Sequence, residues 1–234
     1  MATTTTETAA AKAGSRRAQR GAATRELLLD AAERLIGERG IDGISMRQLG
    51  AAVGQGNNSV IQYHFASKEG LIREIVGRRG RELAPMRDVM LAQARAEGRT
   101  GDVATLLKIL LLPIASFKDD AGRHVYAAFM LHGLRAMWGA DEGIGRAFWS
   151  GEGAISEAIA LLGKQRPDLG TDALARRLLR LSRFFVTSLV DWDKLNELGD
   201  PIDSEAYFLD DLFNMMTAAF LAPPPDTPAT TDSH

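Results

Sequence analysis

Apolar residues recur at helical spacing through most of the chain. From Thr24 to Arg39, for example, Leu28, Ala32 and Leu35 follow one another at intervals of three or four and form one apolar stripe. No window shows the sustained period-two alternation of a half-buried strand. No repeat of 20–50 residues is visible either, which argues against a helical solenoid. The pattern predicts an all-α protein with nine or ten helices.

Capping residues, glycines and prolines indicate where the helices begin and end. Ser45 with Gln48 forms a Ser-x-x-Gln capping box, and Gly40 suits the end of the helix before it. The fourth helix begins at 68 and reaches at least 81, with an extension past Pro85 to 97 left open. The other helices are expected at 24–39, 45–53, 58–65, 102–117, 120–138, 142–163, 171–194 and 202–221.

The two ends of the chain lack this periodicity. Residues 1–22 contain a short basic segment with Arg16, Arg17 and Arg20, and we expect a disordered arm that is either a minor-groove arm or a solvated tail. Residues 222–234 contain four prolines and are expected to be a disordered tail. The N-terminus has no apolar core of signal-peptide length, and no apolar run reaches the ~20 residues that span a bilayer. We therefore expect a cytoplasmic protein.

The composition excludes cysteine chemistry and shows an uneven distribution of charge along the chain. The chain has no cysteine, which rules out disulfides, thiolate catalysis and zinc–thiolate sites. The formal net charge of −2 conceals an uneven distribution. Residues 1–81 hold 13 Lys/Arg and 8 Asp/Glu, net +5, and the remainder is net −7. This indicates a small basic module attached to an acidic body.

The basic part has the order helix, short helix, glycine turn, short helix. That is the order of a helix-turn-helix DNA reader, in which the second helix of the pair enters the major groove by its N-terminal end. A generic helical hairpin with a glycine turn is the alternative. Small or polar residues after the turn, and cations or helix ends nearby, are the candidates for base and phosphate contacts: Thr24, Ser45, Arg47, Asn57, Asn58, Ser59, Val60, Gln62 and Lys68.

Residues 36–54 and 60–72 resemble the DNA-binding domain of the tetracycline-repressor (TetR) family. The strongest piece is His64-Phe65-x-Ser67-Lys68-x-x-Leu71. The resemblance implies a hydroxyl on phosphate at Ser45, groove-facing residues at 57–60, and backbone contacts at His64 and Lys68. Gln62 stands where the family usually has a phosphate-contacting Tyr, and Tyr63 follows one residue later.

The resemblance also implies an N-terminal three-helix reader and a C-terminal helical bundle that binds an effector and dimerises. We expect the arm at 1–22, the helix-turn-helix domain at 23–70, the ligand-binding and dimerisation domain at 71–221, and the tail at 222–234. The last two helices are apolar on more than one face, which suits either a dimer or a deep monomer core. The residues predicted for dimerisation are Leu181, Phe185, Leu189, Trp192, Phe208, Leu212 and Met216.

The middle helices are rich in Met and aromatic residues. Taken singly, each is better explained as core; as a group, with the resemblance, they predict a pocket for a small apolar or aromatic effector. The candidates are Met86, Met90, Phe117, Tyr126, Phe129, Met130, His132, Trp138, Phe148, Trp149 and Phe184.

The chain has none of the short motifs that mark common enzyme classes, and its four histidines are scattered. No catalytic residue, metal or cofactor is expected. The function predicted is a homodimeric repressor released from a palindromic operator by its effector. Two alternatives stay open: a helical enzyme or small-molecule carrier with a helix-turn-helix-like bundle, and an activator of the same family.

Overall fold

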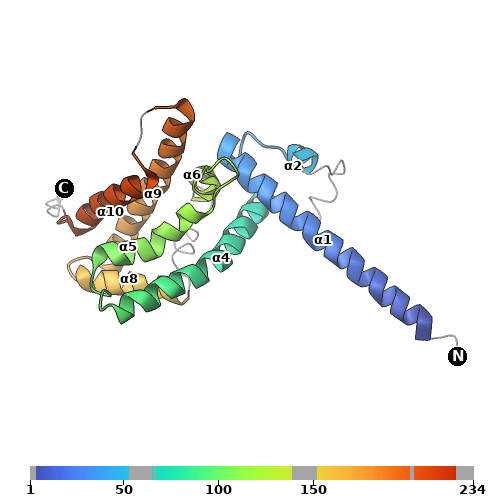
Figure 1. Cartoon of the computed structure of the whole chain (residues 1–234), viewed down its shortest axis with the longest axis horizontal. Helices are drawn as coiled ribbons and strands as arrows, with labels where there is room; N and C mark the ends of the chain where they lie inside the picture. The colour runs from blue at the N-terminus through green and yellow to red at the C-terminus, as the bar shows by residue number, and fades with distance from the viewer. Residues whose placement is uncertain (1–3, 53–64, 66, 139–151, 201–202, 225–234) are drawn as a thin grey trace, which may run out of the picture. The chain divides into compact units, whose positions relative to one another are not determined.

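The computed structural model describes residues 4–52, 65, 67–138, 152–200 and 203–224. Within them the chain is all-α, with no strand and a single isolated bridge between Lys118 and His124, which confirms the predicted fold class. Figure 1 shows the helices and their order. They are α1 (Thr4–Arg39), α2 (Met46–Ala52), α4 (Lys68–Ala96), α5 (Val103–Leu111), the 3-10 helix η1 (Leu112–Ser116), α6 (Val125–Trp138), α8 (Ala154–Gln165), α9 (Thr171–Leu198) and α10 (Glu205–Leu221).

Two helices differ from their predicted bounds for local reasons. The helix expected at 102–117 changes to a 3-10 turn after Leu111, because Pro113 has no N–H and its ring crowds the preceding turn. The helix expected from 120 begins at Val125 instead. The Asp119 carboxylate accepts the backbone N–H groups of Ala121 and Arg123 and holds that segment in a turn.

Other predictions concern how far individual helices continue along the chain. The longer alternative for α4 is confirmed, since the helix continues past Pro85 to Ala96. The helix expected at 58–65 lies almost entirely outside the described residues, as does the first part of the one expected at 142–163.

The N-terminal segment is corrected by the structure. α1 begins at Thr4, so there is helix where the sequence analysis expects a disordered arm over 1–22. The expectation rested on missing apolar periodicity, which reports on packing. Ala9–Ala11, Ala13 and Ala18 have the highest intrinsic helix propensity and favour helix without any packing partner.

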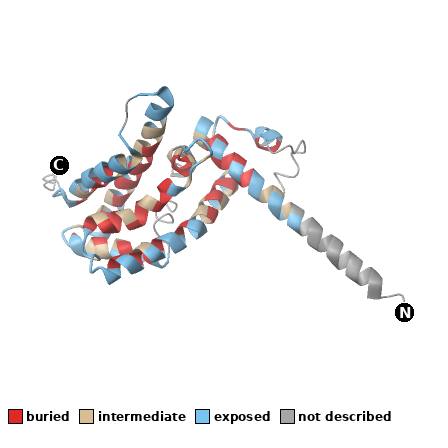
Figure 2. Cartoon of the chain, viewed as in Figure 1, coloured by how far each residue is buried: buried red, intermediate tan, exposed pale blue. Residues whose placement is uncertain are grey.

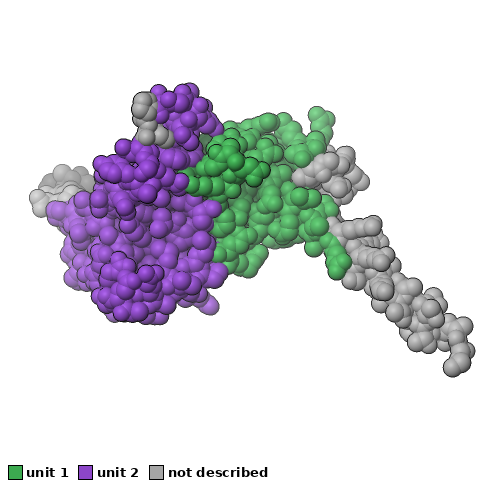
Figure 3. Space-filling view, viewed as in Figure 1, with its two compact units in different colours: residues 1–82, 117–141 green, residues 83–116, 142–234 purple. Residues whose placement is uncertain are grey.

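Unit 1 of the chain comprises residues 1–82 and 117–141 (Figure 3). Its core is formed where α1 packs on α6 and α2, and ion pairs join α1 to α4. The buried side of α1 is seen in Figure 2. At Gly37 the two helix backbones approach so closely that an added Cβ would lie 3.0 Å from the Ala128 Cβ and 3.2 Å from the Phe129 nitrogen. The largest buried side chains here are Leu28, Leu29, Leu71, Ile72, Ile75, Tyr126 and Phe129.

Unit 2 comprises residues 83–116 and 142–234. At its centre is α5, which is buried over most of its length and contacts α8 and α10. α9 and α10 pack on each other, with the Phe185 and Phe213 ring centroids 5.4 Å apart. The division does not coincide with the domain boundary expected at residue 70, because α4 runs unbroken through that boundary and α6 packs on α1.

Candidate nucleic-acid interface

The entry to α2 is stabilised by the predicted capping box. The Gln48 N–H donates to the Ser45 hydroxyl at 3.2 Å, and the Ser45 N–H donates to the Gln48 side-chain carbonyl at 2.7 Å. The two side chains thus satisfy helix-end donors reciprocally. Arg47, two residues after Ser45, is exposed at the same end of α2. The geometry leaves Arg47 accessible to a phosphate.

Lys68 ties the start of α4 to the turn before α2. Its ammonium donates to the Ile41 carbonyl at 3.0 Å, and the side chain is half-buried. Ser67 caps the same helix end, with the Gly70 N–H donating to its hydroxyl at 3.1 Å. An ammonium has three donors, so this contact leaves Lys68 able to reach a phosphate as well. The role that the structure itself shows is to fix the turn that precedes α2.

Thr24 is placed differently from its prediction. It was expected at a helix N-terminus with free backbone N–H groups for phosphate. Because α1 begins twenty residues earlier, at Thr4, Thr24 is a half-buried residue in mid-helix and its N–H belongs to a helical segment. The remaining predicted contacts lie outside the described residues: Asn57, Asn58, Ser59, Val60, Gln62, Tyr63 and His64.

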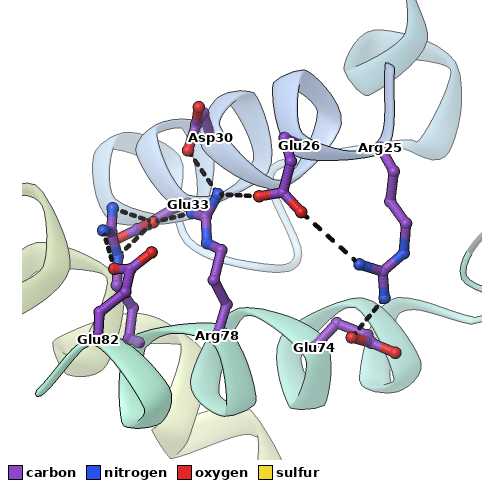
Figure 4. Close-up of polar contacts among 8 residues, drawn as sticks. Arg25, Glu26, Asp30, Glu33, Glu74, Arg78 and Glu82 are labelled. Carbon is purple, nitrogen blue, oxygen red and sulfur yellow. Dashed lines mark hydrogen bonds and ion pairs between the residues drawn. The ribbon is translucent and has the colours of Figure 1, made fainter. Parts of the chain in front are cut away.

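A cluster of ion pairs, which the sequence pattern did not predict, holds α1 against α4. Glu33 is 1% exposed and accepts from two neighbouring arginines. The distances are 2.7 Å from Arg78 Nη2 and 2.9 Å from Arg79 Nε. Asp30 accepts from Arg78 Nη1 at 2.6 Å. Figure 4 shows the carboxylates of α1 facing the arginines of α4.

The charges in this cluster are mutually stabilised. Burial alone would lower the pKa of Arg78, but its hydrogen bond to Asp30 and the charges of Asp30 and Glu33 raise it above the ordinary value. The pKa of Arg79 is raised in the same way, chiefly through Glu33. The Arg79 guanidinium also lies 4.2 Å from the Phe117 ring centroid. The sequence carries no clear signal of this cluster, because Glu33 lies at the edge of the apolar stripe of α1 and not among its members.

Neither of two clefts in the described part of the chain, one in each unit, is lined by any of the predicted effector residues. Tyr126, Phe129 and Met130 are core side chains of unit 1, 5% exposed or less, and the Tyr126 ring contacts those of Phe117 and Phe129. A cleft of about 510 Å³ lies in unit 1 among α1, α2, α4 and the start of α6, and none of the predicted residues lines it. In unit 2, Met86 and Phe184 are exposed and Met90 is half-buried; His132 of unit 1 is exposed. The side chain of Trp138 and residues Phe148 and Trp149 lie outside what the structure describes.

The structure buries most of the predicted dimerisation residues inside one chain. They form the seam between α9, α10 and the rest of unit 2, where side chains of both helices meet. Leu181, Phe185, Leu189, Leu212 and Met216 are buried, and Trp192 and Phe208 are half-buried and stacked at 5.9 Å. When a helix is apolar on two faces, its sequence does not show which of the two faces packs against other helices of the same chain. The exposed apolar residues of this pair are Phe184, Leu195, Leu198, Tyr207, Met215 and Leu221.

Among the described residues, no group of His, Cys, Asp or Glu is arranged to hold a metal ion. No helix in the described part of the chain is long and apolar enough to cross a membrane.

Residues 28–75 match the family of bacterial regulatory proteins described as the tetR family. The match begins inside α1, includes α2 and ends inside α4, so it contains Glu33, the capping box and Lys68. No curated protein matches the chain.

Proposed function

We propose, from the premise that this chain is a DNA-binding transcriptional regulator of the tetR family, that it is a homodimeric repressor released from a palindromic operator by a small apolar or aromatic effector. The match over the α1–α2–α4 region is the observation that carries the premise. The net charge of +5 over residues 1–81 supports a DNA-facing role for this end of the chain.

The path from effector to reader that we propose runs through α4. This helix contributes residues 68–82 to unit 1 and the rest to unit 2. In unit 1 its Arg78 and Arg79 bind Glu33 of α1. A displacement of α4 therefore acts directly on α1. Release requires that the effector prefer the arrangement that does not fit the operator.

The effector and dimer parts of the proposal rest on different supports. The abundance of Met and aromatic residues in the middle helices supports an apolar effector. A two-fold operator favours a two-fold dimer. The exposed apolar residues of α9 and α10, in place of the buried set predicted from sequence, support a second copy on that face.

The test is binding of the full-length protein to DNA from upstream of its own gene, followed by fluorescence anisotropy at increasing salt. We expect the logarithm of the affinity to fall linearly with the logarithm of the salt concentration. Arg47→Ala should reduce that slope by about one, as expected for one lost phosphate contact. Arg73→Ala, which removes an exposed arginine of α4 outside the predicted contacts, is the matched control and should leave the slope unchanged.

Asn58→Ala should lower affinity for this DNA more than for a scrambled sequence, because base contacts carry the specificity. Equal affinity of the wild-type protein for both sequences would contradict an operator-binding function. Addition of apolar aromatic compounds to the complex then tests release.

A further inference from the structure

The outward face of α9 has an uneven charge distribution. Residues at spacings of three and four along it are exposed or half-buried, whereas the opposite stripe is buried. Cations come first, an aromatic residue lies in the middle, and an acid with two leucines follows. In order, this face presents Arg176, Arg180, Phe184, Ser188, Asp191, Leu195 and Leu198.

The cations at the first end of this face have no role within the chain that the structure shows. Arg177, on the flank, donates to the Phe220 and Ala222 carbonyls and closes the end of α10. Arg176 and Arg180 are exposed and form no ion pair with any described residue. Two guanidinium groups are thus available at the outer surface.

The other end of the face is an acidic cleft of about 520 Å³ between α9 and α10. α10 runs back alongside α9, as Figure 1 shows, so its acidic first half lies beside the acidic second half of α9. Residues 191–211 hold eight Asp/Glu and one Lys, a net charge of −7 that equals that of the whole chain beyond Arg81. The cleft is lined by Ser188, Asp191, Trp192, Leu195, Asp203, Tyr207, Phe208 and Asp211.

We infer that this cleft receives Arg180 of a second copy of the chain, and that its Asp191 pairs with that guanidinium. The inference rests on the homodimer of the proposed function and names how the two copies recognise each other. In an antiparallel pairing of α9 with its counterpart, each acidic end faces a basic end. The same contact then forms twice, as a two-fold interface requires.

The spacing along α9 is compatible with this pairing. Arg180 and Asp191 are eleven residues apart on the same face, about 16 Å at the rise of an α-helix. Their midpoint falls at residues 185–186, between Phe184 and Ser188, where the face is least charged. A two-fold axis there places Phe184 at the apolar centre, with 42% of its surface exposed in the single chain. Arg180 of each copy then lies opposite Asp191 of the other.

The lining of the cleft suits a guanidinium in particular. Carboxylates bind arginine by paired charge-assisted hydrogen bonds, and aromatic faces attract its planar cation. Asp191, Asp203 and Asp211 form no ion pair with any described residue. Tyr207 is exposed beside them. In a parallel pairing of the two α9 helices, by contrast, the two acidic ends would face and repel each other.

Charge exchange between the two positions tests the inference by sedimentation equilibrium of the full-length protein. Arg180→Glu sets a carboxylate against Asp191 twice per dimer, and Asp191→Arg brings two guanidinium groups together. Each single change should raise the dimer dissociation constant roughly tenfold or more, equivalent to about 1.4 kcal/mol. The double variant R180E/D191R restores opposite charges and should return to within about threefold of the wild type. Arg81→Glu, the same charge change at an exposed arginine of α4, should have no effect.

The outcomes separate this inference from the proposed function. A wild-type protein that stays monomeric at micromolar concentration would overturn both. A wild-type dimer that neither single change weakens, or that the double variant fails to restore, would overturn the pairing and leave the dimeric regulator standing. Circular dichroism of each variant confirms that the helices are intact.

The absence of cysteine permits a second, independent measurement. In the variant Arg180→Cys/Asp191→Cys, two short side chains replace an arginine–carboxylate pair, so the thiols of the two copies face each other across a gap too wide for a disulfide. A short bis-maleimide spacer, which does not span the about 16 Å between the two thiols of one chain, can then join them only between copies. We expect a covalent dimer on a denaturing gel. Arg81→Cys/Asp191→Cys should remain monomeric on the same gel. A monomer from the first pair would contradict the proposed pairing.

Discussion

Glu33 is a charged residue that unit 1 encloses almost completely. It has 1% of its surface exposed and is shared by two arginines. Removal of one partner from a buried ion pair destabilises by about 3–5 kcal/mol. We expect Glu33→Gln to cost about 3 kcal/mol, since Arg78 retains Asp30. Urea unfolding followed by circular dichroism measures this loss. Glu82→Gln, at the exposed partner of Arg79, is the control and should cost less than about 1 kcal/mol.

Asp102 makes a pH-dependent contribution at the start of α5. Its carboxylate accepts the Thr105 hydroxyl at 2.6 Å and the Ala104 N–H at 3.1 Å. The Thr105 bond is the largest cause of a pKa below the ordinary 3.8. A depressed folded-state pKa means that this stability is present above the ordinary value and is lost as pH falls through the folded-state pKa.

We therefore expect Asp102→Ala to destabilise by about 1 kcal/mol at pH 7, as loss of an N-cap does. The difference from wild type should shrink in urea titrations at pH 3 and below. Asp102→Asn keeps an acceptor at the cap and should cost only a few tenths of a kcal/mol at pH 7. A difference that stays constant over this pH range would contradict the assigned role of the ionised carboxylate.

At the scale of elements, the packing of α1 on α6 depends on a missing side chain at Gly37. A Cβ there would already be 3.0–3.3 Å from Ala128 and the Phe129 nitrogen, and a branched residue would push against backbone. Gly37→Val should destabilise by about 1–3 kcal/mol, in the range of overpacked cores. Gly80→Ala on α4 is the matched contrast, because nothing lies within 4 Å of its added Cβ. It should stabilise by about 0.5–1 kcal/mol through helix propensity. Thermal unfolding of both variants measures these opposite changes in stability.

At the scale of the whole molecule, the proposed dimer would make DNA binding by the basic reader depend on the acidic body. A two-fold reader loses one half-site when its dimer dissociates. On dilution of the protein, the fraction of operator DNA bound by Arg180→Glu should therefore fall more steeply than the fraction bound by the wild type. The double variant R180E/D191R should behave like the wild type again. Anisotropy at several protein concentrations measures the effect, with scrambled DNA as the reference. An operator affinity of Arg180→Glu that matches the wild type at every dilution would argue against this link.

Local sequence was sufficient for features whose determinants lie within a few residues of each other. The Ser45–Gln48 capping box, the start of α4 and the all-α class follow from spacing, capping and propensity. The match to the tetR family rests on the same kind of contiguous pattern. One local feature was predicted wrongly: the Ala-rich segment from Thr4 forms helix although it has no apolar stripe.

Only the tertiary structure decided which partner each face meets. Periodicity identified α9 and α10 as apolar on more than one side. It could not tell that Phe185 and Leu189 are covered within the chain while Phe184 and Leu195 are left outside. Nor could it pair Glu33 with arginines 45 and 46 residues away. The physical reason is that burial is non-directional: an apolar stripe must be covered, but nothing in the stripe specifies by what. The sequence by itself thus determined the helices and the match to the tetR family over residues 28–75. The packed chain decided the buried cluster that joins α1 to α4 and which apolar residues of α9 and α10 stay exposed.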